Sequence, residues 1–452
     1  MTEIRGRSRV ALVLLCTAVF LDSMDLSLMG VALPSVRREL SLSEGTLQWL
    51  VSGYAVAYGG FLLLGGRLAD LLGRRRMFVL SLTAFAAASL AGGLFSDGAL
   101  LVVTRIVKGL AAALTAPAAL SLITTTFTEQ AQRTRALGVY SLAGATGYTG
   151  GLVLSGLLTD VSWRLVFFLP VPLALLVAAL TPLVIPRNAG QADSVRGFDA
   201  SGAAAVTGGV LLVVYALSER DWVAGMVAVL LLVAFVFIER RHHNPLVPLA
   251  VFRVRAVRAA NTAALAWACA TIGWQFAAVL YLQQILHYDA LATGLGIAPM
   301  GLAIFLAANL AGKLIARWGL GRVAALGMLM QACGILLFLR ADSTSGYLTV
   351  LLPALVVHGI GNGLSFPSLN IAAVRDLPDH QQGLASGLIT SAVQIGAGVG
   401  VAVLATLLTA PGLTGYRLAF LAAGGFSLIG ALVAALGIRG TTTTRQPVPT
   451  QS

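Results

Sequence analysis

Four ionisable side chains, Asp22, Asp25, Arg105 and Lys108, interrupt long apolar stretches of this sequence. A charge at the centre of a membrane helix costs about 2.5–3.5 kcal/mol, so four unpaired charges would cost about 10 kcal/mol. Two carboxylates and two cations can neutralise one another. A carboxylate that loses its cationic partner in an apolar setting instead binds a proton, because desolvation favours its neutral form. The chemistry that these residues suggest is proton binding and release.

The spacing of the four residues predicts how they pair. Asp22 and Asp25 are three residues apart and share a helix face, as do Arg105 and Lys108. Antiparallel stacking of the two helices would give two rungs, Asp25 with Arg105 and Asp22 with Lys108. Arg105 cannot release a proton, so we expect Asp25 to carry the proton and Asp22 to be a candidate second carrier. The alternative is a static pair of salt bridges that only orients two helices.

The composition explains why these charges must lie in a membrane. The chain has 452 residues, of which 58% are hydrophobic and 11% charged, whereas soluble domains carry about 25% charged residues. This excludes a soluble enzyme, a secreted disulfide scaffold and a disordered protein. The net charge of +12 resides mainly in short breaks between apolar runs, which is typical of cytoplasmic loops and not of a nucleic-acid partner. Scattered Cys and His residues predict no metal site.

Apolar runs long enough to cross about 30 Å of hydrocarbon predict an all-α integral membrane protein with fourteen transmembrane helices. The expected spans are 10–33, 46–66, 77–96, 99–122, 136–158, 163–185, 200–218, 222–238, 259–284, 291–312, 320–339, 347–370, 383–409 and 416–438. With the N-terminus inside, the inner segments hold 22 basic residues and the outer loops six. Because cytoplasmic loops are enriched in Lys and Arg, both termini are predicted to be cytoplasmic.

An internal repeat divides the chain into halves. Residues 66–73 and 312–319 share the frame G-x-L-x-x-x-x-G after the second and tenth spans. If both loops lie on one side of the membrane, the halves are parallel repeats in a 6+2+6 arrangement. The predicted units are an N-terminal six-helix bundle (1–186), two inserted helices with a basic linker (187–252), a C-terminal six-helix bundle (253–438) and a disordered cytoplasmic tail (439–452).

Several motifs carry a family resemblance. Residues 66–76, Gly-Arg-Leu-Ala-Asp-Leu-Leu-Gly-Arg-Arg-Arg, resemble the loop 2–3 signature of the major facilitator superfamily. Residues 24–34, with Asp25 nine positions before Pro34, are similar to the first-helix motif of its fourteen-helix drug:proton antiporter branch. Residues 105–109 resemble the fourth-helix motif of that branch, with Lys108 where Gln is usual.

The resemblance also implies roles for individual residues. It implies that Gly66, Asp70, Gly73 and Arg74 form a conformational latch between the halves on the cytoplasmic side. Gly147, Gly151 and Gly156 match the small-residue ladder of the fifth-helix antiporter motif, a smooth face for close helix contact. This chain has Leu152 where the family has Pro, and Ser155 where it has Gly, so the usual kink is not expected.

Aromatic and amide side chains suit a cavity for bulky, weakly polar ligands. The candidates are Trp49, Tyr54, Trp274, Gln275, Phe276, Tyr281 and Gln283. For each of them the alternative is a lipid-facing or interfacial position.

Together these features predict a plasma-membrane exporter, not an enzyme, that moves hydrophobic or cationic antibiotic-like molecules outward in exchange for protons. It would act as a monomer without a cofactor, using the proton gradient as its energy source. One alternative is a dedicated exporter of a single endogenous metabolite or peptide. The others are a channel and a membrane-embedded enzyme that uses Asp22 and Asp25 as an aspartyl pair.

Overall fold

The computed structural model describes most of the chain. The described residues are 2–127, 129–186, 199–242, 245, 247, 249–342, 346–377 and 379–438. The predicted disordered tail at 439–452, and residues 187–198 of the predicted linker, lie outside them.

Helices account for nearly all of the described residues, among which there is no strand. The long helices are α1 (Thr2–Leu40), α2 (Glu44–Leu72), α3 (Arg74–Leu94), α4 (Gly98–Thr126), α5 (Gln130–Val161), α7 (Pro170–Val184), α8 (Ala200–Glu219), α9 (Trp222–Arg241), α10 (Arg255–Gln284), α11 (Ala290–Trp318), α12 (Leu320–Leu337), α13 (Leu352–Arg375), α14 (Asp379–Leu408) and α15 (Leu413–Gly437). The short α6 (Arg164–Phe168) precedes α7, and short helical turns occupy Leu249–Arg253, Phe338–Arg340 and Tyr347–Leu351. In the described part of the chain, eleven helical segments are long and apolar enough to cross a membrane.

Polar caps set where several helices begin. Asp97, Asp199, Asp221 and Asp289 each precede a helix and accept a hydrogen bond from a backbone N–H of its first turn. Such caps satisfy N–H groups that have no partner within the helix. Asp97, Asp221 and Asp289 follow the preceding helix within a few residues, so the helices on either side of each run antiparallel.

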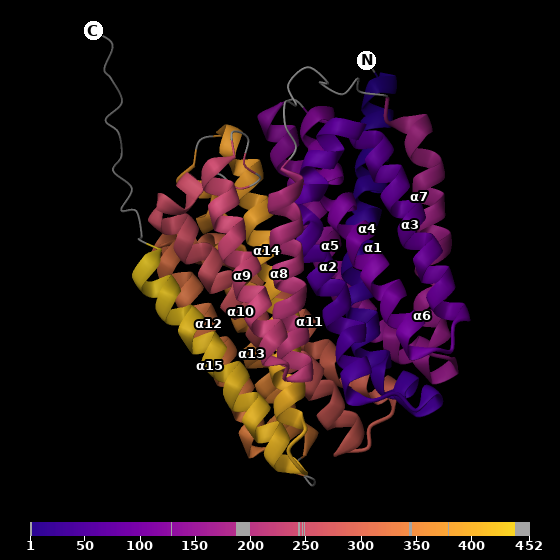
Figure 1. Cartoon of the computed structure of the whole chain (residues 1–452), viewed down its shortest axis with the longest axis vertical. Coiled ribbons are helices and arrows are strands. Elements are labelled where there is room, and N and C mark those ends of the chain that lie inside the picture. The colour runs from indigo at the N-terminus through magenta and orange to yellow at the C-terminus, as the bar shows by residue number, and fades with distance from the viewer. Residues whose placement is uncertain are drawn as a thin grey trace.

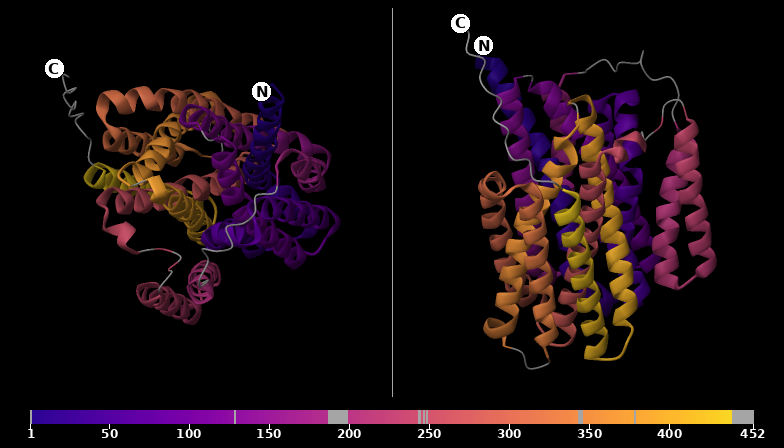
Figure 2. Two further views of the ribbon diagram at one scale, coloured as in Figure 1. Left: turned by 90° about the horizontal axis from the view of Figure 1, so that it is seen from above. Right: turned by 90° about the vertical axis from the view of Figure 1, so that its left-hand side faces the viewer.

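The helices form two bundles side by side (Figure 1), with α1–α7 in one and α10–α15 in the other. The hairpin of α8 and α9 stands at the periphery (Figure 2). Thr207 on α8 donates to the carbonyl of Gly60 on α2 at 2.9 Å, and Thr406 on α14 donates to the carbonyl of Leu217 on α8 at 3.1 Å. The α8 helix therefore contacts both bundles at the seam between them.

The two glycines that end the repeated octapeptides occupy the same backbone conformation. Gly73, between α2 and α3, has φ +92° and ψ 124°, and Gly319, between α11 and α12, has φ +86° and ψ 153°. Side chains other than glycine avoid this region because their Cβ would collide with the backbone. This explains why both copies of the frame end in glycine, where one helix turns sharply into the next.

Close backbone contacts join the bundles at the end of the molecule away from the N-terminus. A Cβ at Gly156 on α5 would lie 2.8 Å from the carbonyl oxygen of Ala290 on α11, and a Cβ at Gly294 would lie 2.8 Å from that of Leu152. Gln283 on α10 donates to the carbonyl of Val31 on α1 at 3.2 Å. Helices of opposite bundles thus meet with little side-chain volume between them.

Candidate functional site

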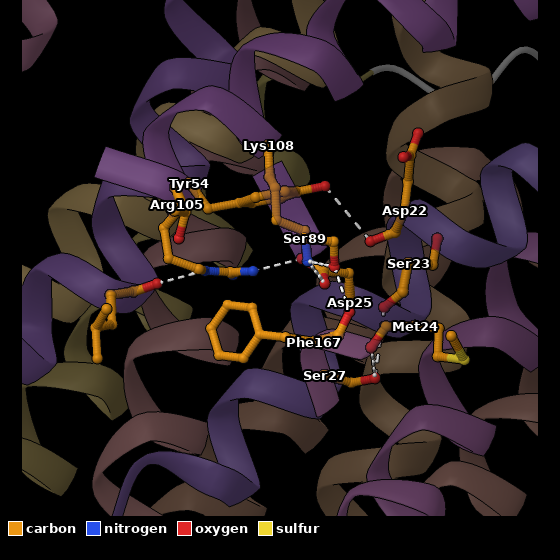
Figure 3. Close-up of polar contacts among 12 residues, drawn as sticks. Asp22, Ser23, Met24, Asp25, Ser27, Tyr54, Ser89, Arg105, Lys108 and Phe167 are labelled. Carbon is orange, nitrogen blue, oxygen red and sulfur yellow. Dashed lines mark hydrogen bonds and ion pairs between the residues drawn. The ribbon is translucent and has the colours of Figure 1, made fainter. Parts of the chain in front are cut away.

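Three of the four buried ionisable residues of α1 and α4 form one cluster, which consists of Asp25, Arg105 and Lys108 (Figure 3). The Asp25 carboxylate bonds two cations, Arg105 through Oδ2 and Lys108 through Oδ1. All three side chains are at most 1% exposed. Since Arg105 and Lys108 are one helical turn apart, about 4.5 Å along the axis, the carboxylate can lie between them and present one oxygen to each.

Arg105 is held in place from α2. Its Nε donates to the carbonyl of Leu50 at 2.8 Å, and its guanidinium carbon lies 4.7 Å from the centre of the Tyr54 ring. A cation over an aromatic face is stabilised by the ring quadrupole. The close approach of α2 depends on Gly109 of α4, because a Cβ there would collide with the carbonyl oxygen of Tyr54.

Lys108 is held from the opposite side, by α3 and α6. Its Nζ donates to Ser89 Oγ at 3.0 Å, and Ser89 in turn donates to the carbonyl of Phe167 at 2.6 Å. The ammonium also lies 4.7 Å from the ring centre of Phe85 and 5.3 Å from that of Phe167. These partners draw the ammonium toward α3 and α6.

The predicted rung between Asp22 and Lys108 is therefore wrong, whereas that between Asp25 and Arg105 is present. Lys108 bonds Asp25 because Ser89 and the two phenylalanine rings hold its ammonium there. Asp22 is 5% exposed, and its buried Oδ1 has no hydrogen-bond partner among the described residues. Figure 3 shows its carboxylate directed away from the cluster, while its backbone carbonyl faces the hydroxyl of Tyr54 at 3.5 Å.

The residues that complete this site were not predicted from the sequence. They are Ser89 and Phe85 on α3, Phe167 on α6 and, through its carbonyl, Leu50 on α2. Ser89, a hydroxyl within an apolar run, was a usable signal. A backbone carbonyl and phenylalanines in an apolar helix carry no such signal.

The predicted latch lies at the turn between α2 and α3. Gly66 and Asp70 are in the last turns of α2, but their side chains lie outside what the structure describes, so the latch stays a prediction. Arg74 begins α3 after the sharp turn at Gly73. Arg75 donates to the carbonyl of Ile185 at 2.9 Å, at the C-terminal end of α7, where a cation is favoured by the helix dipole.

The small residues of α5 face two different helices. A Cβ at Gly147 would lie 2.9 Å from Phe20 Cα, and one at Gly151 would lie 2.7 Å from the carbonyl oxygen of Met24, both on α1. Gly156 faces α11 of the other bundle, as described above. Leu152 is fully buried, and α5 continues as one helix through it. Gly147 and Gly151 thus pack α5 against the segment of α1 that carries Asp22 and Asp25, whereas Gly156 packs α5 against the other bundle.

Replacing Gly147 with alanine is expected to destabilise the protein or displace α1, because the new methyl would collide with the backbone at Phe20. Gly150 is the matched control, since it lies on the same helix and a Cβ there would meet nothing within 4 Å. Gly150→Ala should be neutral or stabilising, by up to about 1 kcal/mol of helix propensity. Thermal unfolding of both purified variants measures the difference, and equal melting temperatures would contradict the close contact.

The seven cavity candidates lie in four different surroundings. Trp49 packs against Tyr215 of α8 with ring centres 6.5 Å apart, and Tyr54 lies beside Arg105. Trp274, Phe276 and Tyr281 are buried in an apolar core to which both bundles contribute. Gln275 and Gln283 instead bridge the bundles, by accepting a hydrogen bond from Tyr148 and by donating to Val31. Both amides of α10 thus form hydrogen bonds to the N-terminal bundle.

Comparison with known proteins gives a consistent family. The family model described as Major Facilitator Superfamily matches residues 15–401 and 263–451. The puromycin resistance protein of Streptomyces alboniger is 37% identical over 88% of this chain and 81% of its own length. The cephamycin export protein of Amycolatopsis lactamdurans is 34% identical, over 90% of this chain and 88% of its own. The lincomycin resistance protein of Streptomyces lincolnensis is 33% identical, over 96% of this chain and 92% of its own length.

Solved structures share the fold at low sequence identity. A bacterial homologue of the human lysosomal transporter Spinster, in an inward-facing and unoccupied conformation, superposes with a TM-score of 0.69 at 15% identity, over 96% of this chain and 97% of that one. The nucleoside transporter NupG, as a point mutant, superposes with a TM-score of 0.67 at 13% identity, over 95% of this chain and 100% of that one. From its family model, its relatives and its fold, this chain belongs to the Major Facilitator Superfamily, in the branch of drug and antibiotic exporters, and is a membrane transporter and not an enzyme.

Proposed function

We propose that this protein exports hydrophobic or cationic, antibiotic-like molecules across the plasma membrane in exchange for protons, by alternating access. The observation that carries the proposal is the buried cluster of Asp25, Arg105 and Lys108 between α1 and α4. Ionisable residues at membrane depth are costly and typically mark proton or substrate pathways. The names of two relatives, which refer to resistance to puromycin and to lincomycin, support the class of cargo.

We further propose the complete membrane topology. In addition to the eleven apolar segments, α2, α5 and α8 would cross the membrane, giving fourteen helices in a 6+2+6 layout with two parallel halves. The positive φ that Gly73 and Gly319 share at corresponding turns supports the repeat. The excess of basic residues on one side supports cytoplasmic termini. With that orientation, the contacts of Gly156 and Gly294 would hold the two bundles together at the outer end.

A second candidate is export of a single endogenous compound. The relatives named for cephamycin and for tetracenomycin C carry the word export with one compound, and Leu152 replaces the proline of the antiporter motif. A toxicity panel in a host that lacks its own efflux pumps separates the two. Protection against several unrelated compounds supports multidrug export, protection against one supports a dedicated exporter, and no protection against any compound contradicts both.

Proton coupling needs its own measurement. In inverted membrane vesicles, a compound identified by the panel should accumulate when a pH gradient is imposed, and collapsing the gradient with a protonophore should stop it. Accumulation that persists after the gradient is collapsed would contradict proton exchange.

The latch is tested by Asp70→Asn. If Asp70 holds the halves together in one conformation, the variant should slow turnover several-fold and leave the affinity for the exported compound unchanged, because it lies at the end of α2 and outside the charged cluster. Transport rates and equilibrium binding are measured on the same preparation. A loss of binding in proportion to the loss of transport would contradict a latch.

A further inference from the structure

Asp22 and Asp25 lie one turn apart on α1, yet their carboxylates have different partners. Both oxygens of Asp25 bond cations. In the described part of the chain, the side chain of Asp22 makes no hydrogen bond or ion pair, and its Oδ1 is buried without a partner. The two acids therefore have different chemistry, although the sequence alone suggested two equivalent rungs.

The groups that face Asp22 come from three neighbouring helices. Tyr54 and Tyr58 of α2 and Tyr140 of α5 interact with it electrostatically, as do Lys108 of α4 and, on its own helix, Asp25. The tyrosines are neutral hydroxyls, and Lys108 is bonded to Asp25. Asp22 thus has polar neighbours but, within the described part of the chain, no bonded cation.

Protonation has opposite consequences for the two carboxylates. A proton on Asp25 would displace bonds to Arg105 and Lys108 and leave two buried cations without an anion, which is strongly unfavourable. A proton on Asp22 breaks no bond and removes an unpaired buried charge. With both acids ionised, the two acids and two bases sum to a formal charge of 0, and a proton on Asp22 makes it +1.

We propose that Asp22, and not Asp25 of the first-helix motif, is the carboxylate that takes up the proton on one side of the membrane and releases it on the other. The proposal rests on the proton exchange proposed above. The step is the reversible addition of a proton from water to the Asp22 carboxylate, which gives the carboxylic acid and changes no other bond. Asp25 stays ionised and is a positioning residue that holds α1 against α4.

The test is infrared spectroscopy of the purified full-length protein, titrated with pH in the absence of any transported compound. A protonated carboxylic acid has a carbonyl band that an ionised carboxylate lacks. The wild type should show this band, lose it reversibly as the pH rises, and shift it in heavy water because the proton exchanges. Asp22→Asn should lack the band, and Asp22→Glu should restore it at a different frequency.

Two controls separate Asp22 from other buried acids. Asp199 is also buried, with one unpartnered oxygen, but caps α8, so Asp199→Asn should leave the band unchanged. The triple variant Asp25→Asn, Arg105→Gln, Lys108→Gln removes the second acid together with its cations and should also keep the band. Absence of the band from the wild type throughout the titration, its survival in Asp22→Asn, or its loss in either control would overturn the proposal.

A transport measurement distinguishes this proposal from the proposed function. With puromycin as the probe, Asp22→Asn vesicles should exchange labelled for unlabelled compound but not respond to a pH gradient. If wild-type vesicles move neither puromycin nor any compound of the toxicity panel, the proposed function fails, while the infrared band still decides whether Asp22 binds the proton. If Asp22→Asn still responds fully to the gradient, the proton does not travel on Asp22.

Discussion

Replacing Asp25 with asparagine is expected to destabilise the protein by about 3–5 kcal/mol, the usual cost of removing one partner of a buried ion pair. The amide cannot neutralise Arg105 and Lys108, which are buried and bond only this carboxylate among the acids described. The free energy of unfolding in detergent, together with the yield of monodisperse protein, measures the effect. Transport should be lost as well, because α1 and α4 no longer hold together.

The matched control for this prediction lies on the same helix face. Asp22→Asn makes the same chemical change three residues away, but no bonded partner is lost, so its stability should stay within about 0.5 kcal/mol of the wild type. The triple variant that also replaces Arg105 and Lys108 with glutamine should recover much of the stability lost in Asp25→Asn, since it removes all three charges. A wild-type melting temperature for Asp25→Asn would mean that the cations have other means of neutralisation.

Coupling between residues gives the second large effect. In a double-mutant cycle, Asp25→Asn and Lys108→Gln should show a coupling energy of about 1–3 kcal/mol, because the two side chains are bonded. The cycle of Asp22→Asn with Lys108→Gln should couple by less than about 0.5 kcal/mol. Unfolding free energies of the wild type, the three single variants and the two double variants, measured in one detergent, supply both cycles.

A further substitution, at Ser89, refines this test. Ser89→Ala removes the hydroxyl that holds the Lys108 ammonium toward α3, so it should increase the coupling between Asp22 and Lys108. If the first cycle shows no coupling and the second shows a strong one, Lys108 pairs with Asp22 in solution, and the assignment of Asp22 as the unpartnered acid would be wrong.

The membrane class and the location of the charged cluster were predictable from the sequence. Apolar runs separated by short polar breaks specify membrane helices because the hydrocarbon core satisfies no backbone hydrogen bond outside a helix or a closed barrel. The need to neutralise buried charges brought α1 and α4 together, and Asp25 does bond Arg105. The repeated glycine at the end of each octapeptide was also evident in the sequence, and both copies adopt a positive φ.

The surroundings of the aromatic cavity candidates could not be predicted from the sequence. Trp49, Trp274 and Tyr281 satisfy the same compositional criterion, yet Trp49 lies against α8, whereas the other two pack against rings of α13 and α15. In an all-apolar helix, hydrophobic periodicity does not distinguish a face toward lipid from one toward another helix or a cavity. Side-chain direction therefore had to come from the packing.

The sequence by itself determined that this is a helical membrane protein with a buried, neutralisable set of two acids and two bases. Only the tertiary structure decided which acid takes both cations. That choice depends on Ser89, Phe85 and Phe167, which reach Lys108 from α3 and α6 and hold its ammonium on Asp25. Spacing along two helices fixes which residues share a face, but the long lysine side chain spans more than one turn. The partner of Lys108 is therefore set by α3 and α6, which pack around its ammonium group.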